Sequence, residues 1–225
     1  MRSLIVGGGA IGQFLGACLS QGGHEPTILA RSEQARAISA SGITMRRGDT
    51  SSTRKIAASD GPESAAFQEP IELVIVAVKA YSTSEAIASI AGLPACRNAT
   101  IMTVQNGLGN EEALAEAFGA ERVIAGALTV AVERAGATTV VAGAKGGLTL
   151  APVGSTPHNW VMAAFAGSGL DVRAASDWRA LKWSKLLINI LGNGVCAALD
   201  WSPEENRAAV VSPPAAPPDP LWRSS

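Results

Sequence analysis

The hydrophobic positions of the chain form short runs that are separated by glycine-rich or polar stretches. Leu4 to Val6 is the first such run, and three glycines and a series of small, mostly apolar residues up to Leu19 follow it. This order predicts a strand, a tight turn and a buried helix. A second strand over 26–30 and a second helix over 32–41 complete a βαβα unit.

Later runs predict further strands. Residues 71–78 form a continuous apolar run rich in Val and Ile, which is typical of a strand buried on both faces of a parallel sheet. The polar segment over 43–57 predicts a surface hairpin, and the chain as a whole predicts an α/β fold. We expect more strands of the same sheet over 100–104, 123–132, 138–142 and 148–151.

The pattern changes after about residue 175. Residues 177–199 contain no proline and have the length of a helix. From Arg207 onward Ala, Pro, Ser and Arg predominate without apolar periodicity. This composition predicts a disordered tail over 207–225.

Composition narrows the class of protein. The 225 residues include 18 basic and 19 acidic side chains, and a net charge of -1 offers no field that would attract nucleic acid or an anionic membrane. The three cysteines show no C-x-x-C spacing, so no disulfide framework or metal site is expected. No apolar stretch has the length of a membrane span, and the amino-terminal one is too short for a signal peptide. We therefore expect a soluble, cytoplasmic protein.

The glycine-rich turn after the first strand is the first candidate site. It fits the pattern G-x-G-x-x-G in the βαβ context that this pattern requires. The first glycine permits a sharp turn, the second lets the backbone approach a pyrophosphate, and the third allows close packing of helix and strand. The alternative is a purely structural turn. We predict a Rossmann-type dinucleotide-binding site formed by Gly7, Gly8, Gly9, Ala10, Ile11 and Gly12.

The residues after the second strand bear on the choice of dinucleotide. Sites that prefer NAD usually have Asp or Glu there, because the carboxylate accepts hydrogen bonds from the adenosine ribose. No acid follows Leu29 directly, whereas Arg31 is close by, and a guanidinium suits the 2′-phosphate of NADP. The sequence therefore favours NADP (NADPH). The alternative is that Arg31 is a solvated loop residue.

A polar stripe interrupts the apolar helix predicted over 177–199. Lys185, Asn189 and Asn193 are spaced four residues apart and fall on one helix face. An ammonium group there can protonate a carbonyl oxygen or stabilise a developing alkoxide, and the amides can orient a carboxylate or a hydroxyl. The alternative is an amphipathic helix with its polar face in water.

Two loops that follow buried strands each carry a candidate residue. Asn106 lies in a Gly/Asn-rich loop after 100–104, and Lys79 ends the run over 71–78. Ligands of open α/β sheets bind beyond the carboxyl ends of the strands, so both residues are placed to contact cofactor or substrate. Asn-Gly is also an ordinary turn dipeptide, and a plain loop role is the alternative for both residues.

Four motifs in this order resemble the ketopantoate reductase (2-dehydropantoate 2-reductase) family. Together they are far more specific than the glycine loop alone, and the resemblance covers residue 1 to about 205. The motifs are GGGAIG with Arg31, VKAYST over 78–83, QNGLGNEE over 105–112 and KLLINILGN over 185–193.

The resemblance implies NADPH-dependent reduction of a small 2-oxo acid, 2-dehydropantoate, to pantoate on the route to pantothenate and coenzyme A. It implies that Arg31 holds the 2′-phosphate and that Lys79 and Asn106 line the cofactor and the reaction centre. The backbone near Val132 would lie beside the nicotinamide.

The family's proton donor matches Lys185, with Asn189 and Asn193 as substrate contacts. A lysine is charged at neutral pH, because its reference pKa is about 10.4. In this scheme Lys185 supplies the proton while NADPH supplies the hydride.

The same resemblance divides the chain into an NADP-binding Rossmann domain over 1–175 and the first part of an all-helical substrate domain over 176–206. The family's second domain is longer, and nothing over 207–225 matches its later helices. We therefore expect a truncated second domain, with a frameshift or premature end as the hypothesis for the tail. An uncovered apolar helix predicts self-association or a homo-oligomer. Reduction of another 2-oxo acid and an inactive NADP-binding remnant are the alternative functions.

Overall fold

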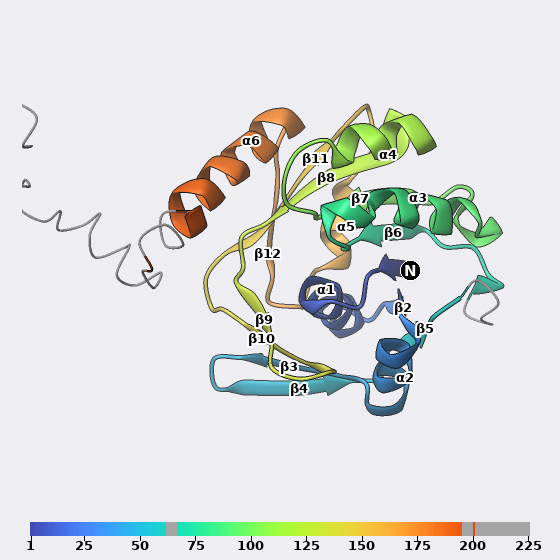
Figure 1. Ribbon diagram of the computed structural model, residues 1–225, viewed down its shortest axis with the longest axis vertical. Helices are drawn as coiled ribbons and strands as arrows, with labels where there is room; N and C mark the ends of the chain where they lie inside the picture. Colours follow the sequence, from blue (N-terminus) through green and yellow to red (C-terminus); the bar gives the residue numbers. More distant parts are fainter. Residues whose placement is uncertain (62–66, 195–199, 201–225) are drawn as a thin grey trace, which may run out of the picture. The chain divides into compact units, whose positions relative to one another are not determined.

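The computed structural model describes residues 1–61, 67–194 and 200 (Figure 1). The chain divides into two compact units, Met1–Trp183 and Ser184–Ser225. Of the parts predicted from sequence, the tail over 207–225 lies outside the described residues. The domain boundary after residue 175 stays a prediction.

The first unit is built on an eight-stranded sheet with the order β12-β11-β8-β7-β6-β1-β2-β5. The six strands from β8 to β5 are parallel, β11 is antiparallel to β8, and β12 is parallel to β11. The strands are β1 (Arg2–Val6), β2 (Glu25–Leu29), β5 (Ala57–Ser59), β6 (Leu73–Val76), β7 (Thr100–Thr103), β8 (Val123–Leu128), β11 (Gly147–Pro152) and β12 (Asp171–Ala174). The chain order reverses between β1 and β6, which is where ligands of such sheets bind.

Helices cover both faces of this sheet. The described α-helices that lie wholly in the first unit are α1 (Ala10–Gln21), α2 (Ser32–Ser41), α3 (Thr83–Ala91), α4 (Asn110–Phe118) and α5 (Asn159–Ala164), with short 3-10 turns η2 (Ala80–Ser82), η3 (Pro94–Cys96) and η4 (Ala120–Arg122). In β1, Ile5 packs with Phe14 of α1 on one face, whereas Leu4 and Val6 pack with Ile90 of α3 on the other. This alternation is the reason that β6, at the centre of the sheet, is apolar at every position.

A second, four-stranded sheet has the order β4-β3-β10-β9. Its strands are β3 (Ile43–Arg47), β4 (Thr50–Arg54), β9 (Val132–Arg134) and β10 (Thr139–Ala142), and Figure 1 shows it on the side of α1, which β3, β9 and β10 contact. The predicted hairpin over 43–57 is confirmed as β3 and β4.

The assignment of 123–132 and 138–142 to one sheet was wrong. The first run divides, because β8 stays in the large sheet and Val132 begins β9 of the small one. In β10, Val140 and Ala142 are buried while Val141 is exposed, so this strand has a single buried face. One-sided burial fits a small sheet over α1 rather than a central strand.

Helix α6 (Trp178–Asn189) begins in the first unit and continues into the second. Asp177 caps its start, because its Oδ1 accepts hydrogen bonds from the backbone amides of Arg179 at 2.9 Å and Ala180 at 3.1 Å. A π-helical turn, η5 (Ile190–Gly194), follows. The helix predicted over 177–199 is thus confirmed as far as residue 194. None of the described helices is long and apolar enough to cross a membrane.

Candidate active site

The glycine loop connects the end of β1 to the start of α1. Gly7 has φ +120°, a conformation that favours glycine, and a Cβ on Gly12 would stand 1.9 Å from the Gly7 carbonyl oxygen. Nothing lies within 4 Å of where a Cβ of Gly9 would stand. The loop is therefore closed by packing at Gly7 and Gly12 and open to a ligand at Gly9.

Gln13 links the small sheet to the glycine loop by hydrogen bonds. Its side chain is fully buried, and its Nε2 donates to the carbonyl oxygens of Gly8 at 2.9 Å and Ala137 at 3.0 Å. Gln34 also donates to the Ala137 carbonyl, at 2.5 Å. These bonds hold the turn between β9 and β10 beside the loop, which places Arg134 next to it.

Two cavities of about 600 Å³ and 550 Å³ meet at the glycine loop. Both are lined by Gly7, Gly9, Arg31, Val78 and Ser82, so they form one cleft along the carboxyl ends of the parallel strands. This is the position in which open α/β sheets bind dinucleotides.

The cavity on the β2 side collects charged groups of both signs. Arg31, the N-cap residue of α2, lines it together with Arg134 from β9. Glu33 and Asp60 line it as well. A hydrogen bond from the Ser32 side chain is the main reason that the pKa of the exposed Asp60 carboxyl is lowered, so this group is ionised at neutral pH.

The cavity on the β6 and β7 side brings together most of the residues predicted to bind cofactor. Lys79 follows β6 and Asn106 follows β7, and both side chains are exposed. Of the predicted set, this cavity is lined by Gly7, Gly9, Ala10, Ile11, Arg31, Lys79, Asn106 and Val132. Gly8 lines the neighbouring cavity, and Gly12 is buried beneath the loop.

The predicted substrate residues belong to the second unit. Lys185 and Asn189 lie one turn apart on α6, and both are partly buried. Asn193 lies in the π-helical turn.

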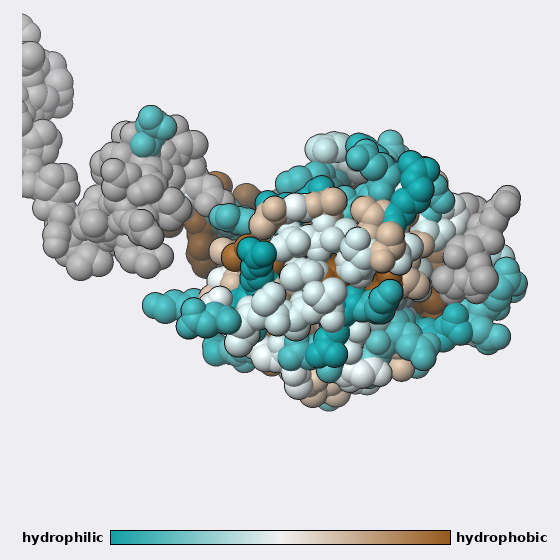
Figure 2. All heavy atoms as spheres, turned by 90° about the horizontal axis from the view of Figure 1, so that it is seen from below, coloured by the Kyte–Doolittle hydropathy of each residue, from teal (hydrophilic) through white to brown (hydrophobic). Residues whose placement is uncertain are grey.

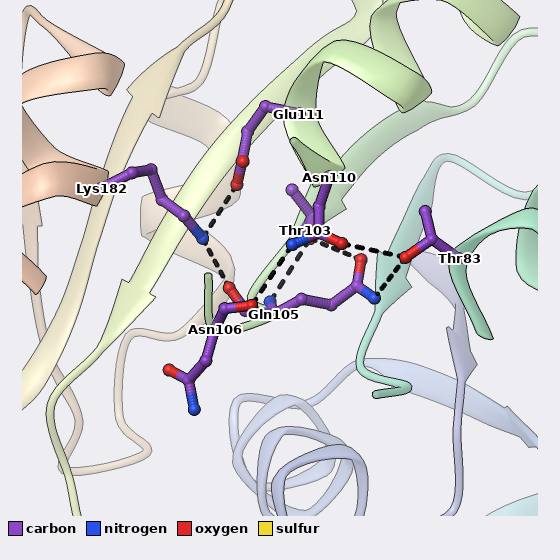
Figure 3. Close-up of polar contacts among 7 residues, drawn as sticks. All are labelled: Thr83, Thr103, Gln105, Asn106, Asn110, Glu111 and Lys182. Atoms are coloured by element: carbon purple, nitrogen blue, oxygen red, sulfur yellow. Dashed lines mark hydrogen bonds and ion pairs between the residues drawn. The ribbon is translucent and has the colours of Figure 1, made fainter. Parts of the chain in front are cut away.

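A polar network behind Asn106 was not predicted from the sequence (Figure 3). Lys182 of α6 contacts Glu111 of α4 and the carbonyl oxygen of Gln105, and the Gln105 side chain contacts Thr83 and Thr103. Lys182 and Gln105 are 77 positions apart in the sequence. In the sequence, the one sign of this network is that Lys182 is a charged residue among the apolar positions of the predicted helix. A charge in that position does not identify its partner.

The chain is similar to known proteins over most of its length. Residues 3–155 match the family described as Ketopantoate reductase PanE/ApbA. A 2-dehydropantoate 2-reductase of Halobacterium salinarum is 31% identical, over 95% of this chain and 70% of that protein.

Among solved structures, the 2-dehydropantoate 2-reductase of Geobacter metallireducens has a TM-score of 0.79 and 33% identity, over 89% of this chain and 66% of that one. A D-mandelate dehydrogenase in a ternary structure with NADH and anilino(oxo)acetate has the same TM-score, 0.79, at 21% identity, over 89% of this chain and 65% of that one. The second likeness concerns the fold alone. The chain thus spans 65% to 70% of the length of these proteins.

Proposed function

The chain belongs to the ketopantoate reductase family, a family of oxidoreductases, and from this premise we propose that it reduces 2-dehydropantoate to pantoate with NADPH. The observation that carries the proposal is the cleft in which the glycine loop, Lys79 and Asn106 come together. One cavity of this cleft suits the adenosine end of a dinucleotide, and the other suits a nicotinamide and a small 2-oxo acid.

The glycine loop is the proposed seat of the pyrophosphate. The open space beside Gly9 lets a phosphate approach the main chain. Helix α1 begins at Ala10, directly after this position, so its amino-terminal amides and the positive end of its dipole face the same space. These features fit an anionic cofactor.

The two arginines on the β2 side support NADPH as the cofactor. Arg31 and Arg134 offer guanidinium groups to a 2′-phosphate, which forms strong charge-assisted hydrogen bonds with such groups. Asp60, whose lowered pKa keeps it charged, is the observation that favours NADH instead, because a carboxylate accepts hydrogen bonds from a ribose hydroxyl.

The other cavity supports reduction of a 2-oxo acid. The chemistry that the cofactor supplies when bound is hydride donation to the carbonyl carbon. Lys79 can pair with the substrate carboxylate, and the Asn106 amide can donate to an oxygen of the substrate. We assign Lys185, by its match to the family motif, as the donor of the proton that converts the carbonyl oxygen into a hydroxyl.

An NADPH oxidation assay tests this proposal. With the full chain, we expect faster oxidation with 2-dehydropantoate than with pyruvate or 2-oxoisovalerate. Lys185→Ala is expected to lower kcat by at least about a hundredfold, which is the usual contribution of a general acid. Lys145→Ala, in the exposed turn between β10 and β11, is the matched control.

Each other outcome identifies an alternative. Faster turnover of a different oxo acid would assign the chain to that substrate. NADPH binding without turnover of any oxo acid would identify a cofactor-binding remnant. An unchanged rate in the Lys185 variant would refute its role as proton donor.

A further inference from the structure

We infer that the buried pair Lys182 and Glu111 is a positioning device for Asn106. The inference rests on the proposed function only for the role that it gives Asn106 in the reaction. Its structural part, the fixation of the loop after β7, can be tested without turnover.

The pair of Lys182 and Glu111 is buried. Lys182 is 2% exposed, Glu111 is fully buried, and Nζ lies 2.9 Å from Oε1. The contact is an ion pair without the alignment of a hydrogen bond, and among the described residues neither carboxylate oxygen of Glu111 has a hydrogen-bond partner. A buried ion pair of this kind is often no more stabilising than apolar side chains of similar volume. Stability alone therefore does not account for it.

The geometry of Lys182 indicates what the pair does. Its Nζ also donates to the carbonyl oxygen of Gln105 at 2.5 Å. The side chain of Gln105 is held as well, because its Nε2 donates to Thr83 Oγ1 at 2.9 Å and its Oε1 accepts from Thr103 Oγ1 at 3.1 Å. Main chain and side chain of the residue before Asn106 are thus both fixed.

The following peptide is held from α4. Asn110 Nδ2 donates to the carbonyl oxygen of Asn106 at 3.3 Å, and Thr83 Oγ1 donates to Asn110 Oδ1 at 2.9 Å. Figure 3 shows the Asn106 side chain pointing away from Lys182. Asn106 lines the cavity that Lys79 and Val132 also line. The network therefore holds the backbone on both sides of a residue that lines the cleft.

Small displacements at such a position affect catalysis strongly. A shift of about 1 Å in a group that orients substrate can cost about a hundredfold in rate. Glu111 lies 2.9 Å from the buried Nζ of Lys182, and the same Nζ holds the peptide of Gln105. Both are positioning residues, because they act on the reaction through Asn106.

The test compares two variants of the full chain, one with two substitutions and one with a single substitution. Lys182→Met combined with Glu111→Leu removes both charges at similar volume, and Glu111→Gln keeps the shape of the side chain but weakens the hold on Lys182. Lys145→Met is the control for loss of an exposed lysine. The measurements are the thermal midpoint, NADPH affinity, kcat, KM, and the amide resonance of Asn106 in isotope-labelled protein.

In the double variant, we expect a broadened or shifted Asn106 resonance and a fall in kcat of at least about tenfold. NADPH affinity and its KM should change by less than about threefold, because the glycine loop is not altered. Glu111→Gln should move the same quantities in the same direction by less. The Lys145 variant should match the wild type.

An unchanged Asn106 resonance and kcat in a folded variant would overturn the inference. A parallel loss of thermal stability, NADPH affinity and kcat would also overturn it, since that pattern indicates general damage. If the wild type turns over no oxo acid, the proposed function fails, and the Asn106 resonance still decides whether the pair fixes the loop.

Discussion

Arg31 is the side chain that we predict to distinguish NADPH from NADH. We expect Arg31→Ala to raise the Kd for NADPH by at least about tenfold and to change the Kd for NADH by less than about threefold, because only NADPH carries the 2′-phosphate. Cofactor fluorescence titration measures both constants. Arg97→Ala, at an exposed position outside the cleft, is the control. An equal increase in the Kd values for the two cofactors would mean that Arg31 does not bind the 2′-phosphate.

Burial of two thiols opposes their ionisation. Burial raises the pKa of Cys18 to about 12 and that of Cys96 to about 11, from an ordinary value of 9.0. In the folded protein at pH 8 we expect neither thiol to react with a disulfide reagent, because the thiolate is the reactive form. Counting labelled thiols in a Cys196→Ser background, before and after denaturation, tests this. Rapid labelling of the native protein would contradict it.

The same shifts predict loss of stability at alkaline pH. A thiol with a raised pKa in the folded state stabilises the fold fully below the unfolded pKa of 9.0, and this contribution is lost as pH rises toward the folded values of about 11 and 12. Denaturant unfolding between pH 8 and pH 10 should show the beginning of this decline. Cys18→Ala should reduce it.

At the scale of elements, the strand–turn–helix unit of the glycine loop depends on close packing. Gly12→Ala places a Cβ at 1.9 Å from the Gly7 carbonyl oxygen, and we expect it to lower the free energy of unfolding by about 1–3 kcal/mol or more. Gly9→Ala meets no atom within 4 Å, so it should leave stability nearly unchanged and weaken NADPH binding. Chemical denaturation and cofactor titration separate the two effects. Equal stability losses in both variants would contradict this account.

Helices α6 and α4 are linked by the pair Lys182 and Glu111. Lys182→Met leaves a buried carboxylate without its compensating charge, and we expect a loss of about 3–5 kcal/mol in the free energy of unfolding. The double variant Lys182→Met/Glu111→Leu should regain most of that loss. A double-mutant cycle by denaturant unfolding measures the coupling. Additive losses would show that the two residues do not act together.

At the scale of the whole molecule, large apolar side chains remain exposed near the end of α6 and in the turn after it. The residues, with their exposed fractions, are Leu187 at 54%, Ile188 at 60%, Ile190 at 53% and Leu191 at 65%. Figure 2 shows hydrophobic atoms gathered at this part of the chain, whereas much of the visible surface of the first unit is hydrophilic or neutral. Such a group of side chains favours association.

We expect the chain to self-associate in a concentration-dependent way. Ile188→Lys combined with Leu191→Lys should shift sedimentation velocity profiles toward the monomer, because charged side chains oppose burial of this group. Val141→Lys, at a position 39% exposed on β10, is the control and should leave the profile unchanged. A wild-type chain that stays monomeric at high concentration would contradict this prediction.

Local patterns were sufficient for the order of the elements around the glycine loop and the central strands. The continuous apolar run that becomes β6 indicated a strand buried on both faces, since a parallel sheet leaves no face in water. The glycine spacing indicated the turn, because Gly7 and Gly12 meet through local geometry. Asn106 and Lys79 could be placed at one edge of the sheet, since the carboxyl ends of parallel strands lie together.

Long-range contacts decided the rest. The sequence by itself determined the α/β order, the glycine loop and the family motifs, because these depend on residues close together in the chain. Only the tertiary structure decided that β10 pairs with β3 rather than with the large sheet. The residues of a strand do not identify the neighbouring strand with which it forms hydrogen bonds. The tertiary structure also decided that Lys182 pairs with Glu111 next to the peptide of Gln105, because burial of a charge depends on which distant side chain packs against it.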